Sequence, residues 1–477
     1  MKDRNLIGRE YECRRLEKSM EETQAQLIIV YGRRRVGKTY LIEQFFDGRF
    51  DFKFTGAYNQ TKEIQLRNFS IELGLQSGKT VSVPKDWTEA FILLREYLTT
   101  RPEEEKKIVF FDEMPWMDTQ KSGFLAAFEY FWNSWGSSRD NLVFIVCGSA
   151  NSWMVENMDR NKGGLFNRWT CRIYLKPFSL GETEQYLSSR GINWSRLDIV
   201  RTYMILGGIP YYLRLLEKEL SLGQNIDRLF FRKRAELWDE FEMLYRTLFE
   251  NSESYIKIAK ALCSKRKGLT WMEIIKETGL HGNGVMSRML SNLEDSGFIR
   301  KQVNKRQQKE TLYIMCDYYT LFYFRFLNLA SRPDEHFWSN CTENPSIRAW
   351  EGLTFENVCM DHVAQIKQKL GISGVLTTES SWADADAQID LVMKRRDHFT
   401  NLCEIKFSTK EYEIDNDYET KLMNKISSYV TSTKTKDSIQ LTMITTFGVR
   451  RNSHSNIMTN QVTMDDLFEI TPASIEE

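Results

Sequence analysis

"QLIIVYGRRRVGKTYLIEQFF", residues 26–46, is the stretch that decides the fold. An apolar run typical of a buried strand leads into Gly32, and after four further residues Gly37-Lys38-Thr39 begins a helical pattern. A loop of this kind turns its backbone N–H groups inward around phosphates, and its glycines permit the close approach and the unusual dihedral angles. We therefore expect an α/β fold in which a phosphate-binding loop, or P-loop, connects a strand to a helix.

Two residues of this loop carry the chemistry that nucleotide binding needs. Lys38 is expected to reach the β- and γ-phosphates, and the hydroxyl of Thr39 is expected to bind Mg²⁺. The predicted cofactors are therefore ATP and Mg²⁺. The predicted nucleotide-binding residues of the loop are Gly32, Arg33, Arg34, Arg35, Val36, Gly37, Lys38, Thr39 and Tyr40.

A second strand-like run, "KKIVFFDEMPWM" at residues 106–117, ends in an acidic pair. In an open α/β sheet, the carboxyl ends of parallel strands deliver functional side chains. We expect Asp112 to hold Mg²⁺ through water, and Glu113 to orient and deprotonate the attacking water. The alternative is a solvated carboxylate pair after a core strand, but the loop upstream favours the catalytic interpretation.

A third strand-like run, "NLVFIVCGSANSWM", ends in Ser149 and Asn151. Either side chain is suited to sense the γ-phosphate, but a helix N-cap uses the same residue types. Further on, Arg168 and Arg172 are candidates for a guanidinium that stabilises transition-state charge, in cis or from a neighbouring subunit. Structural ion pairing is the alternative for both arginines.

Several motifs in the first half of the chain resemble one family. They are "LIGREYECRRLEK", the "GRRRVGKT" loop, "VFFDE", "CGSANSWM", "LFNRWTCRIYLKPFS" and "LGGIPYYL". Together they resemble the archaeal-type ATPase group of the AAA+/STAND-like P-loop NTPases, over roughly residues 1–235. The resemblance implies a P-loop ATPase domain with a parallel sheet and a helical lid. It also implies that the nucleotide site includes the positions beside the adenine, which are Ile7, Gly8, Arg9 and Glu10.

Composition limits the remaining possibilities. A chain of 477 residues exceeds what one core normally supports, so two or three domains are expected. The net charge is zero, which neither supports nor excludes nucleic-acid binding. The eight cysteines form no CxxC pair and the five histidines show no zinc-ligand spacing, so we expect reduced thiols in a cytoplasmic protein. The apolar runs are much shorter than a membrane span of about 20 residues, and no membrane partner is predicted.

Residues 255–302 carry apolar residues at helical spacing in three blocks, which glycine-containing turns separate. With the strand-like runs that end and follow this stretch, the segment resembles a winged helix-turn-helix, and we assign residues 236–335 to this domain. In such a motif the third helix enters a major groove, and Asn283, Ser287 and Arg288 are the side chains that would reach the bases. The alternative is a module that only packs domains together.

The segment 336–477 shows a different pattern. A helical stretch carries Glu356, and two strands joined by a turn carry Asp390 and then Glu404-x-Lys406. Since a strand alternates its faces, Glu404 and Lys406 share one face. Carboxylates are the hard ligands that Mg²⁺ prefers, and a nearby cation orients water and stabilises a phosphate. We expect Asp390 and Glu404 to share one Mg²⁺ with Lys406 in the same site; an ordinary surface ion pair is the alternative.

The order of these residues resembles the PD-(D/E)xK phosphodiesterase fold. The segment also resembles the domain of unknown function, DUF234, that commonly follows this type of ATPase. These resemblances imply an α/β restriction-endonuclease-like domain whose catalytic residues are Asp390, Glu404 and Lys406, with DNA or RNA as the partner. Folds of this class also serve as binding modules that do not cut.

Two functional hypotheses follow. In the first, an ATP-driven enzyme binds DNA or RNA through the winged helix and cuts it with the terminal domain. In the second, ATP and ADP select between two arrangements of a switch, and the terminal domain recognises a protein or nucleic acid without cutting it. The oligomeric state stays open, because an arginine acting in trans would require neighbouring subunits.

Overall fold

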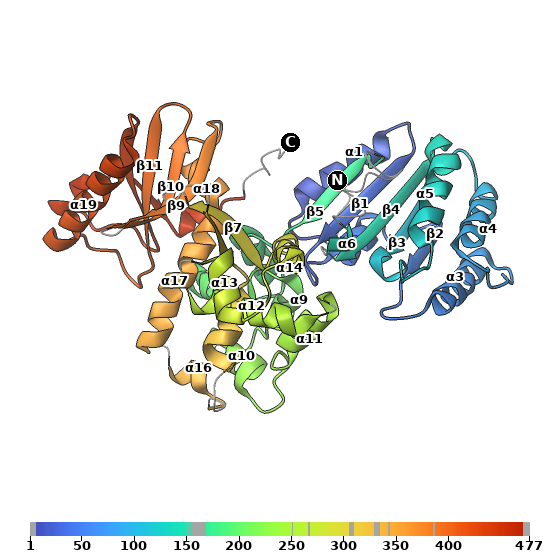
Figure 1. The fold of residues 1–477 in the computed structure, drawn as a ribbon, viewed down its shortest axis with the longest axis horizontal. Coiled ribbons are helices and arrows are strands. Elements are labelled where there is room, and N and C mark those ends of the chain that lie inside the picture. Colours follow the sequence, from blue (N-terminus) through green and yellow to red (C-terminus); the bar gives the residue numbers. More distant parts are fainter. Residues whose placement is uncertain are drawn as a thin grey trace. The chain divides into compact units, whose positions relative to one another are not determined.

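The computed structural model describes residues 6–149, 152–154, 168–249, 251–265, 268–304, 310–328, 334–341, 344–384 and 387–470. The chain forms two compact units, residues 1–177 and residues 178–477 (Figure 1). None of the helices in the described ranges has the length and apolar character that a membrane span requires. All eight cysteines are free thiols, in agreement with the sequence prediction.

The first unit is built on a five-stranded sheet with the order β2-β3-β4-β1-β5, in which every neighbouring pair is parallel. Its strands are β1 (Gln26–Gly32), β2 (Phe52–Thr55), β3 (Lys107–Asp112), β4 (Leu142–Ser149) and β5 (Cys171–Leu175). All eight residues of β4 are buried, as expected of a central strand that is covered on both faces. The predicted α/β fold with a parallel sheet is confirmed.

Helices pack against this sheet (Figure 1). They are α1 (Glu10–Glu21), α2 (Lys38–Phe45), α3 (Lys62–Ser77), α4 (Trp87–Thr99), α5 (Phe124–Ser134) and α6 (Ser152–Met154), with short 3-10 turns at η1 (Met114–Trp116) and η2 (Gly136–Ser138). An aromatic core joins α3, α4 and α5 to the sheet, where Phe91 stacks on Phe111 with ring centroids 5.9 Å apart. Helix α2 contacts β1 and β4, and α1 contacts β5. Burial of this core on the sheet fixes the strand order on which the site depends.

The strand register brings the functional ends together. Gly32 at the end of β1 is level with Ser149 on β4 and with Leu175 on β5. A Cβ at Gly32 would lie 2.3 Å from the carbonyl oxygen of Leu175, so only glycine fits where the loop leaves the sheet. Because all the strands are parallel, the loop after β1, the acidic pair after β3 and the end of β4 share one edge.

The second unit begins with helices. They are α7 (Leu180–Ser189), α8 (Arg196–Leu206), α9 (Pro210–Leu213), α10 (Leu222–Ile226) and α11 (Glu240–Leu248), with a π-helical turn at η4 (Asp227–Phe231). The turn between α8 and α9 contains Gly207 and Gly208, and both glycines have left-handed φ values, of 67° and 64°. A Cβ at Gly208 would lie 2.2 Å from the carbonyl oxygen of Phe178, so this turn packs directly on the start of the unit.

Three helices and an antiparallel hairpin follow. The helices are α12 (Ser252–Ser264), α13 (Trp271–Thr278) and α14 (Gly284–Asp295), and β7 (Ile299–Asn304) pairs with β8 (Glu310–Met315), which also pairs with the short β6 (Leu269–Thr270). The start of α13 has a local reason, because Thr270 and Glu273 form a capping box there. The element order agrees with the predicted one, and its assignment as a winged helix stays a prediction.

The last part of the second unit is a sheet flanked by helices. The helices are α15 (Tyr318–Phe322), α16 (Phe337–Asn340), α17 (Pro345–Asp361), α18 (Val363–Lys369) and α19 (Asn416–Thr433), with further short turns at η5 (Tyr323–Leu327), η6 (His454–Ile457) and η7 (Asp465–Phe468). The strands are β9 (Thr377–Ala383), β10 (Gln388–Arg395), β11 (Phe399–Lys406), β12 (Ser438–Thr445) and β13 (Asn460–Thr463). Their order is β13-β12-β11-β10-β9, antiparallel from β9 to β11 and parallel from β11 to β13. Helix α19 packs its Tyr429 with Trp382, Val392 and Leu402 of the sheet.

Candidate functional site

The P-loop connects β1 to α2, as the sequence predicts. Lys38 is buried, and its Nζ donates hydrogen bonds to the carbonyl oxygens of Gly32 (3.2 Å) and Arg33 (3.1 Å). Gly37 has a left-handed φ of 91°, which positions it before the first helical residue. The ammonium group is therefore held inside the loop, where the loop's N–H groups and the start of α2 favour a bound anion.

The loop is tied to the end of β3 by a hydrogen bond. The Thr39 hydroxyl donates to Oδ2 of Asp112 at 2.8 Å, and the backbone N–H of Glu113 donates to Oδ1 of Asp112 at 3.0 Å. A hydroxyl and a carboxylate at this distance are hard oxygen donors suited to one Mg²⁺ ion, directly or through water. Thr39 and Asp112, both predicted as metal residues, are thus brought together.

Glu113 has an unusual environment. Its backbone lies in the left-handed region, with φ 48° and ψ 48°, which non-glycine residues rarely adopt. Its Oε2 atom is buried and forms no hydrogen bond within the described residues. Burial raises the pKa of this carboxyl above its ordinary value, and the charge of Asp112 adds to the effect, while Lys38 and Arg34 oppose it. A carboxylate that is desolvated and only partly hydrogen-bonded is suited to accept a proton.

Ser149 is buried at the end of β4, between the loop and the acidic pair in the strand order. A hydrogen bond with the backbone of Ser149 lowers the pKa of Glu113, so the two residues are neighbours. Asn151, the other residue predicted at this strand end, lies outside the described residues. Below Asp112, burial raises the pKa of the Cys147 thiol well above its usual range, which makes Cys147 a neutral core residue.

The segment that contains this geometry, residues 6–216, matches the model of a family described as an ATPase domain predominantly from Archaea. These residues form an archaeal-type ATPase domain. The match supports ATP binding at the P-loop, and the predicted resemblance of the first half of the chain is confirmed.

Similar proteins also come from archaea. An uncharacterized protein of Methanocaldococcus jannaschii is 24% identical over 397 residues, which are 81% of this chain and 84% of that protein. A Walker-type ATPase of Pyrococcus abyssi is 21% identical in structure-based comparison, with a TM-score of 0.47 over 68% of this chain and 97% of that chain. The ORC2 protein of Aeropyrum pernix is 13% identical, with a TM-score of 0.44 over 75% of this chain and 95% of that chain. At these identities and scores, neither structure assigns a partner to this chain.

The N-terminal segment of the ATPase domain is attached to the P-loop through Arg9. The side chain is buried, and it donates to the carbonyl oxygens of Lys176 (2.8 Å) and Val36 (3.2 Å). Gly8 and Arg9 both have left-handed φ values, of 65° and 68°, just before α1 begins. Arg9 thus links the N-terminal segment to the P-loop by a hydrogen bond. Contact of Ile7 and Gly8 with adenine stays a prediction.

Arg168 is not brought to the P-loop. It is exposed and precedes β5, and Thr170 just after it donates its N–H to Leu27 near the start of β1. Leu175, at the other end of β5, is level with Gly32. At 3.3 Å per residue the two ends of β5 are about 13 Å apart, and Arg168 lies beyond the end that is opposite to the loop. The expected arginine in cis is therefore not Arg168, and a role for it in trans stays a prediction.

In the second unit, the predicted acidic and basic residues of the C-terminal region form one cluster. Leu391 on β10 pairs with Cys403 on β11, so Asp390 is the next residue along and faces Glu404. Oδ2 of Asp390 accepts the backbone N–H of Ile405 at 3.0 Å, and Oε1 of Glu404 lies 2.7 Å from Nζ of Lys406. Glu404 is 2% exposed, so the pair is not a solvated surface ion pair.

Helix α19 adds two residues that the sequence analysis missed. Nζ of Lys425 lies 2.6 Å from Oε2 of Glu404, and the Tyr418 hydroxyl donates to Oε1 at 2.8 Å. Both Glu404 oxygens therefore have protein partners. Neither Lys425 nor Tyr418 belongs to a motif of the sequence. The pattern of an amphipathic helix shortly after the strand was the sequence signal that could have pointed to them.

The pKa values of the two carboxyl groups of this cluster are shifted in opposite directions. Burial would raise the pKa of Glu404, but the ammonium groups of Lys406 and Lys425 outweigh it, and this pKa lies below its ordinary value. Burial and then the charge of Glu404 raise the pKa of Asp390. Within the described ranges, no group of three or more His, Cys, Asp or Glu side chains is arranged to hold a metal ion, so any metal here would rest on Asp390 and Glu404.

The other predicted residues of the second unit have different environments. Glu356 lies on α17, half-buried. Asn283 is the N-cap of α14, where Oδ1 accepts the N–H groups of Val285 (3.0 Å) and Met286 (3.3 Å). Ser287 and Arg288 are exposed on the same helix. Of the three predicted base-reading residues, Asn283 therefore serves as the N-cap of its helix.

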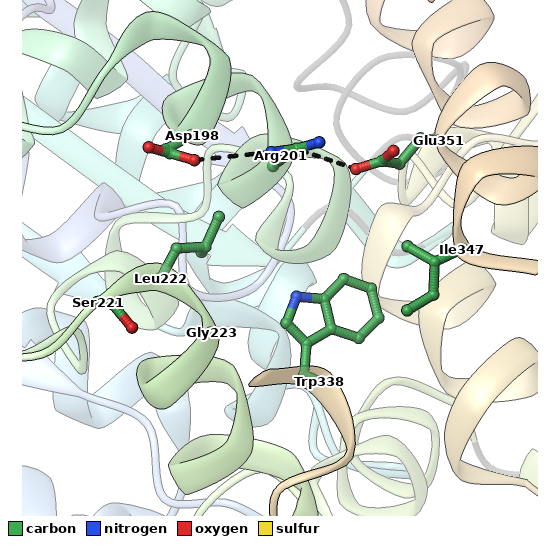
Figure 2. A pocket seen from close by; sticks show the side chains of 8 residues that line it. All are labelled: Asp198, Arg201, Ser221, Leu222, Gly223, Trp338, Ile347 and Glu351. Carbon is green, nitrogen blue, oxygen red and sulfur yellow. Dashed lines mark hydrogen bonds and ion pairs between the residues drawn. The ribbon is translucent and has the colours of Figure 1, made fainter. Parts of the chain in front are cut away.

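A small hollow lies where the first helices of the second unit meet α16 and α17 (Figure 2). Its volume is about 200 Å³, and its lining residues are Asp198, Arg201, Ser221, Leu222, Gly223, Trp338, Ile347 and Glu351. Nε of Arg201 donates to Glu351 at 2.7 Å, so the charged groups of this hollow satisfy one another. The ion pair fastens α8 to α17.

We predict that Glu404→Gln destabilises the second unit by about 2 kcal/mol at pH 7, because it leaves two half-buried ammonium groups without their counter-charge. The folded-state pKa of Glu404 is lowered, so its contribution is fully present above the ordinary glutamate pKa of about 4.3 and is lost as the pH falls further. Thermal unfolding at several pH values measures this difference. The matched control is Glu413→Gln, whose exposed ion pair with Arg450 is expected to change stability by less than about 1 kcal/mol. Equal effects of the two variants would contradict the prediction.

Proposed function

We propose that the archaeal-type ATPase domain hydrolyses ATP with Mg²⁺, through the residues that converge at the carboxyl edge of its sheet. The observation that carries the proposal is the 2.8 Å hydrogen bond between Thr39 and Asp112, with the unpartnered buried oxygen of Glu113 beside it. A carboxylate pair with a purely structural role is not expected to combine a desolvated carboxyl group, a missing hydrogen bond and a left-handed backbone.

The donor set fits a bound Mg²⁺ ion. Thr39 and Asp112 would hold it, and when bound it would neutralise charge on the phosphate oxygens. Lys38 would exchange its two hydrogen bonds to loop carbonyls for bonds to the β- and γ-phosphates. The half-exposed or exposed loop residues Arg34, Arg35 and Tyr40 would border the nucleotide.

Glu113 is proposed as the general base. A water oxygen attacks the γ-phosphorus, the bond from phosphorus to the bridging oxygen of ADP breaks, and the proton of the water passes to Glu113 before it leaves as part of the products. A raised pKa makes Glu113 a better base once it is ionised. Ser149, whose backbone lies beside the Glu113 carboxyl, is the proposed sensor of the γ-phosphate.

We predict that Lys38→Ala abolishes ATP binding, whereas Glu113→Gln binds ATP but loses turnover by at least ~100-fold, because only Glu113 acts on water. Calorimetry with ATP and a phosphate-release assay separate the two effects. In wild type, kcat should rise with pH as Glu113 loses its proton, and burial places that rise above the ordinary glutamate pKa. Equal turnover in wild type and Glu113→Gln would remove this assignment.

For the second unit we propose a restriction-endonuclease-like domain, over residues 336–477, that cleaves DNA or RNA with a divalent metal. Asp390 and Glu404 would hold the ion, and Lys406 and Lys425 would stabilise the phosphate in the transition state. The observation that favours this function is the convergence of two carboxylates and two ammonium groups at neighbouring positions on β10, β11 and α19. Residues 236–335 would bind the nucleic acid as a winged helix, through Ser287 and Arg288.

The alternative proposal is a nucleotide-operated switch whose C-terminal domain binds without cutting. It is favoured by the hydrogen bonds of Glu404, whose two oxygens are already satisfied by Tyr418, Lys406 and Lys425. A metal ion would have to displace these partners. Division into domains at residues 1–235, 236–335 and 336–477 and a cytoplasmic location are part of both proposals, and both are compatible with a monomer or an oligomer.

We predict Mg²⁺- or Mn²⁺-dependent cleavage of at least one member of a panel of single- and double-stranded DNA and RNA, in the presence of ATP. Asp390→Asn should abolish it while ATP hydrolysis continues, because the variant removes a metal ligand but keeps the size of the side chain. Asp390 is a better test than Glu404, whose loss also destabilises the fold. Glu413→Gln is the surface control. No cleavage by a folded protein that hydrolyses ATP would favour the switch.

A further inference from the structure

Helix α3 of the first unit carries apolar side chains on two opposite faces. Its inner face contributes three residues to the aromatic core, namely Leu66, Phe69 and Leu73. On its outer face, the exposed fractions of Ile64, Ile71 and Leu75 are 40%, 48% and 73%. Their spacing places these three side chains in one stripe along the helix. Such a stripe is typical of a helix that packs against a second helix.

Two side chains of opposite charge flank this stripe. Arg67 is exposed, and within the described ranges its guanidinium makes no hydrogen bond or ion pair. Glu72 is half-buried and accepts a hydrogen bond from Nε2 of Gln76 at 3.2 Å, but no cation of the described residues forms an ion pair with it. Arg67 and Glu72 do not pair with each other, because residues at this spacing lie on different sides of a helix.

The positions of these residues are self-complementary in one antiparallel register. We consider α3 packed against α3 of a second copy around a two-fold axis, which makes every contact twice. The register that places Ile64 opposite Leu75 of the second copy also places Arg67 opposite Glu72 of the second copy. The apolar side chains and the charges of this face therefore favour the same occupant, which is a second copy of the chain.

A hollow beside α3 provides space for side chains of the second copy. Its volume is about 610 Å³, and residues of α3 and of the edge strand β2 line it, among them Asn68, Ile71 and Glu72. In the register described above, Ile71 of the second copy lies opposite Asn68. Its side chain is therefore directed at the hollow, where it can be buried.

The edge of the sheet is protected against pairing with a second copy. Strand β2 lies at this edge. The side-chain amide of Gln76 pairs with both the N–H and the C=O of Lys53, at 2.8 Å each. Gln65 pairs in the same way with the N–H and the C=O of Ala57, at 3.0 and 2.7 Å. These two amides occupy hydrogen-bonding groups that an added strand would need, so contact through the helix is favoured over contact through the strand.

We propose that the chain forms a homodimer in which α3 packs antiparallel against α3 of a second copy. Ile64, Ile71 and Leu75 form the centre of the interface, and Arg67 pairs with Glu72 on each side. The P-loop and the acidic pair lie outside α3, so the dimer does not depend on the proposed ATP hydrolysis. One pair of helices buries less than the roughly 1,600 Å² of a standard interface, and we expect a weak dimer with a Kd on the order of 10 µM.

Sedimentation velocity of the chain between about 1 and 100 µM tests the dimer. We expect the sedimentation coefficient of wild type to rise with concentration. Ile71→Glu should raise the Kd at least ~10-fold, because it places a carboxylate in the apolar stripe. The matched control is Ile92→Glu on α4, since Ile92 is also 48% exposed and lies outside the stripe. A wild type that stays monomeric over this range, or an equal effect of the two variants, would overturn the proposal.

Exchange of the two charges tests the antiparallel register. Arg67→Glu and Glu72→Arg should each weaken the dimer, because each variant places like charges opposite one another. The double variant restores opposite charges and should recover the wild-type Kd to within ~3-fold. A double variant as weak as the single variants would overturn the register, and thermal unfolding checks that all variants fold. Phosphate release by the same samples separates the proposals, since a monomer that hydrolyses ATP would overturn only the dimer.

Discussion

The hydrogen bond between Thr39 and Asp112 is the contact on which the account of the first unit depends. It joins the loop after β1 to the end of β3, although β4 lies between these two strands in the sheet. A parallel arrangement brings the three strand ends to one edge, and a dense aromatic core packs on the sheet that contains them. The position of Glu113 follows directly, because it is the next residue after Asp112 and its N–H is bound to the same carboxylate.

The parts of the fold that local patterns determine were predictable from the sequence. The P-loop directly follows the buried strand β1 and the acidic pair stands at the end of the buried strand β3, so each motif contains its own local geometry. Arg168 was not predictable in this way, because its distance from the loop depends on the register between β5 and β1. Asn283 shows a related difficulty, since the same side chain serves a DNA-reading helix or an N-cap, and the structure shows the cap.

The C-terminal cluster illustrates what long-range packing adds. Glu404 and Lys406 were placed on one face by the period of a strand, and their ion pair confirms that placement. Lys425 and Tyr418 come from α19, and they reach Glu404 only because the helix folds back onto the sheet. No residue-level pattern connects them to the strand. They also change the chemistry, because the lysines lower the pKa of Glu404 and compete with any metal ion for its oxygens.

In the proposed ATPase site, Asp112 and Thr39 mark the position of Mg²⁺ beside the bound nucleotide. The most direct measurement is the affinity for a non-hydrolysable ATP analogue with and without Mg²⁺, in wild type and in Asp112→Asn. Mg²⁺ is expected to tighten binding to wild type, and most of this gain should disappear in Asp112→Asn while metal-free binding remains. An equal gain from Mg²⁺ in the two proteins would mean that Asp112 does not hold the ion.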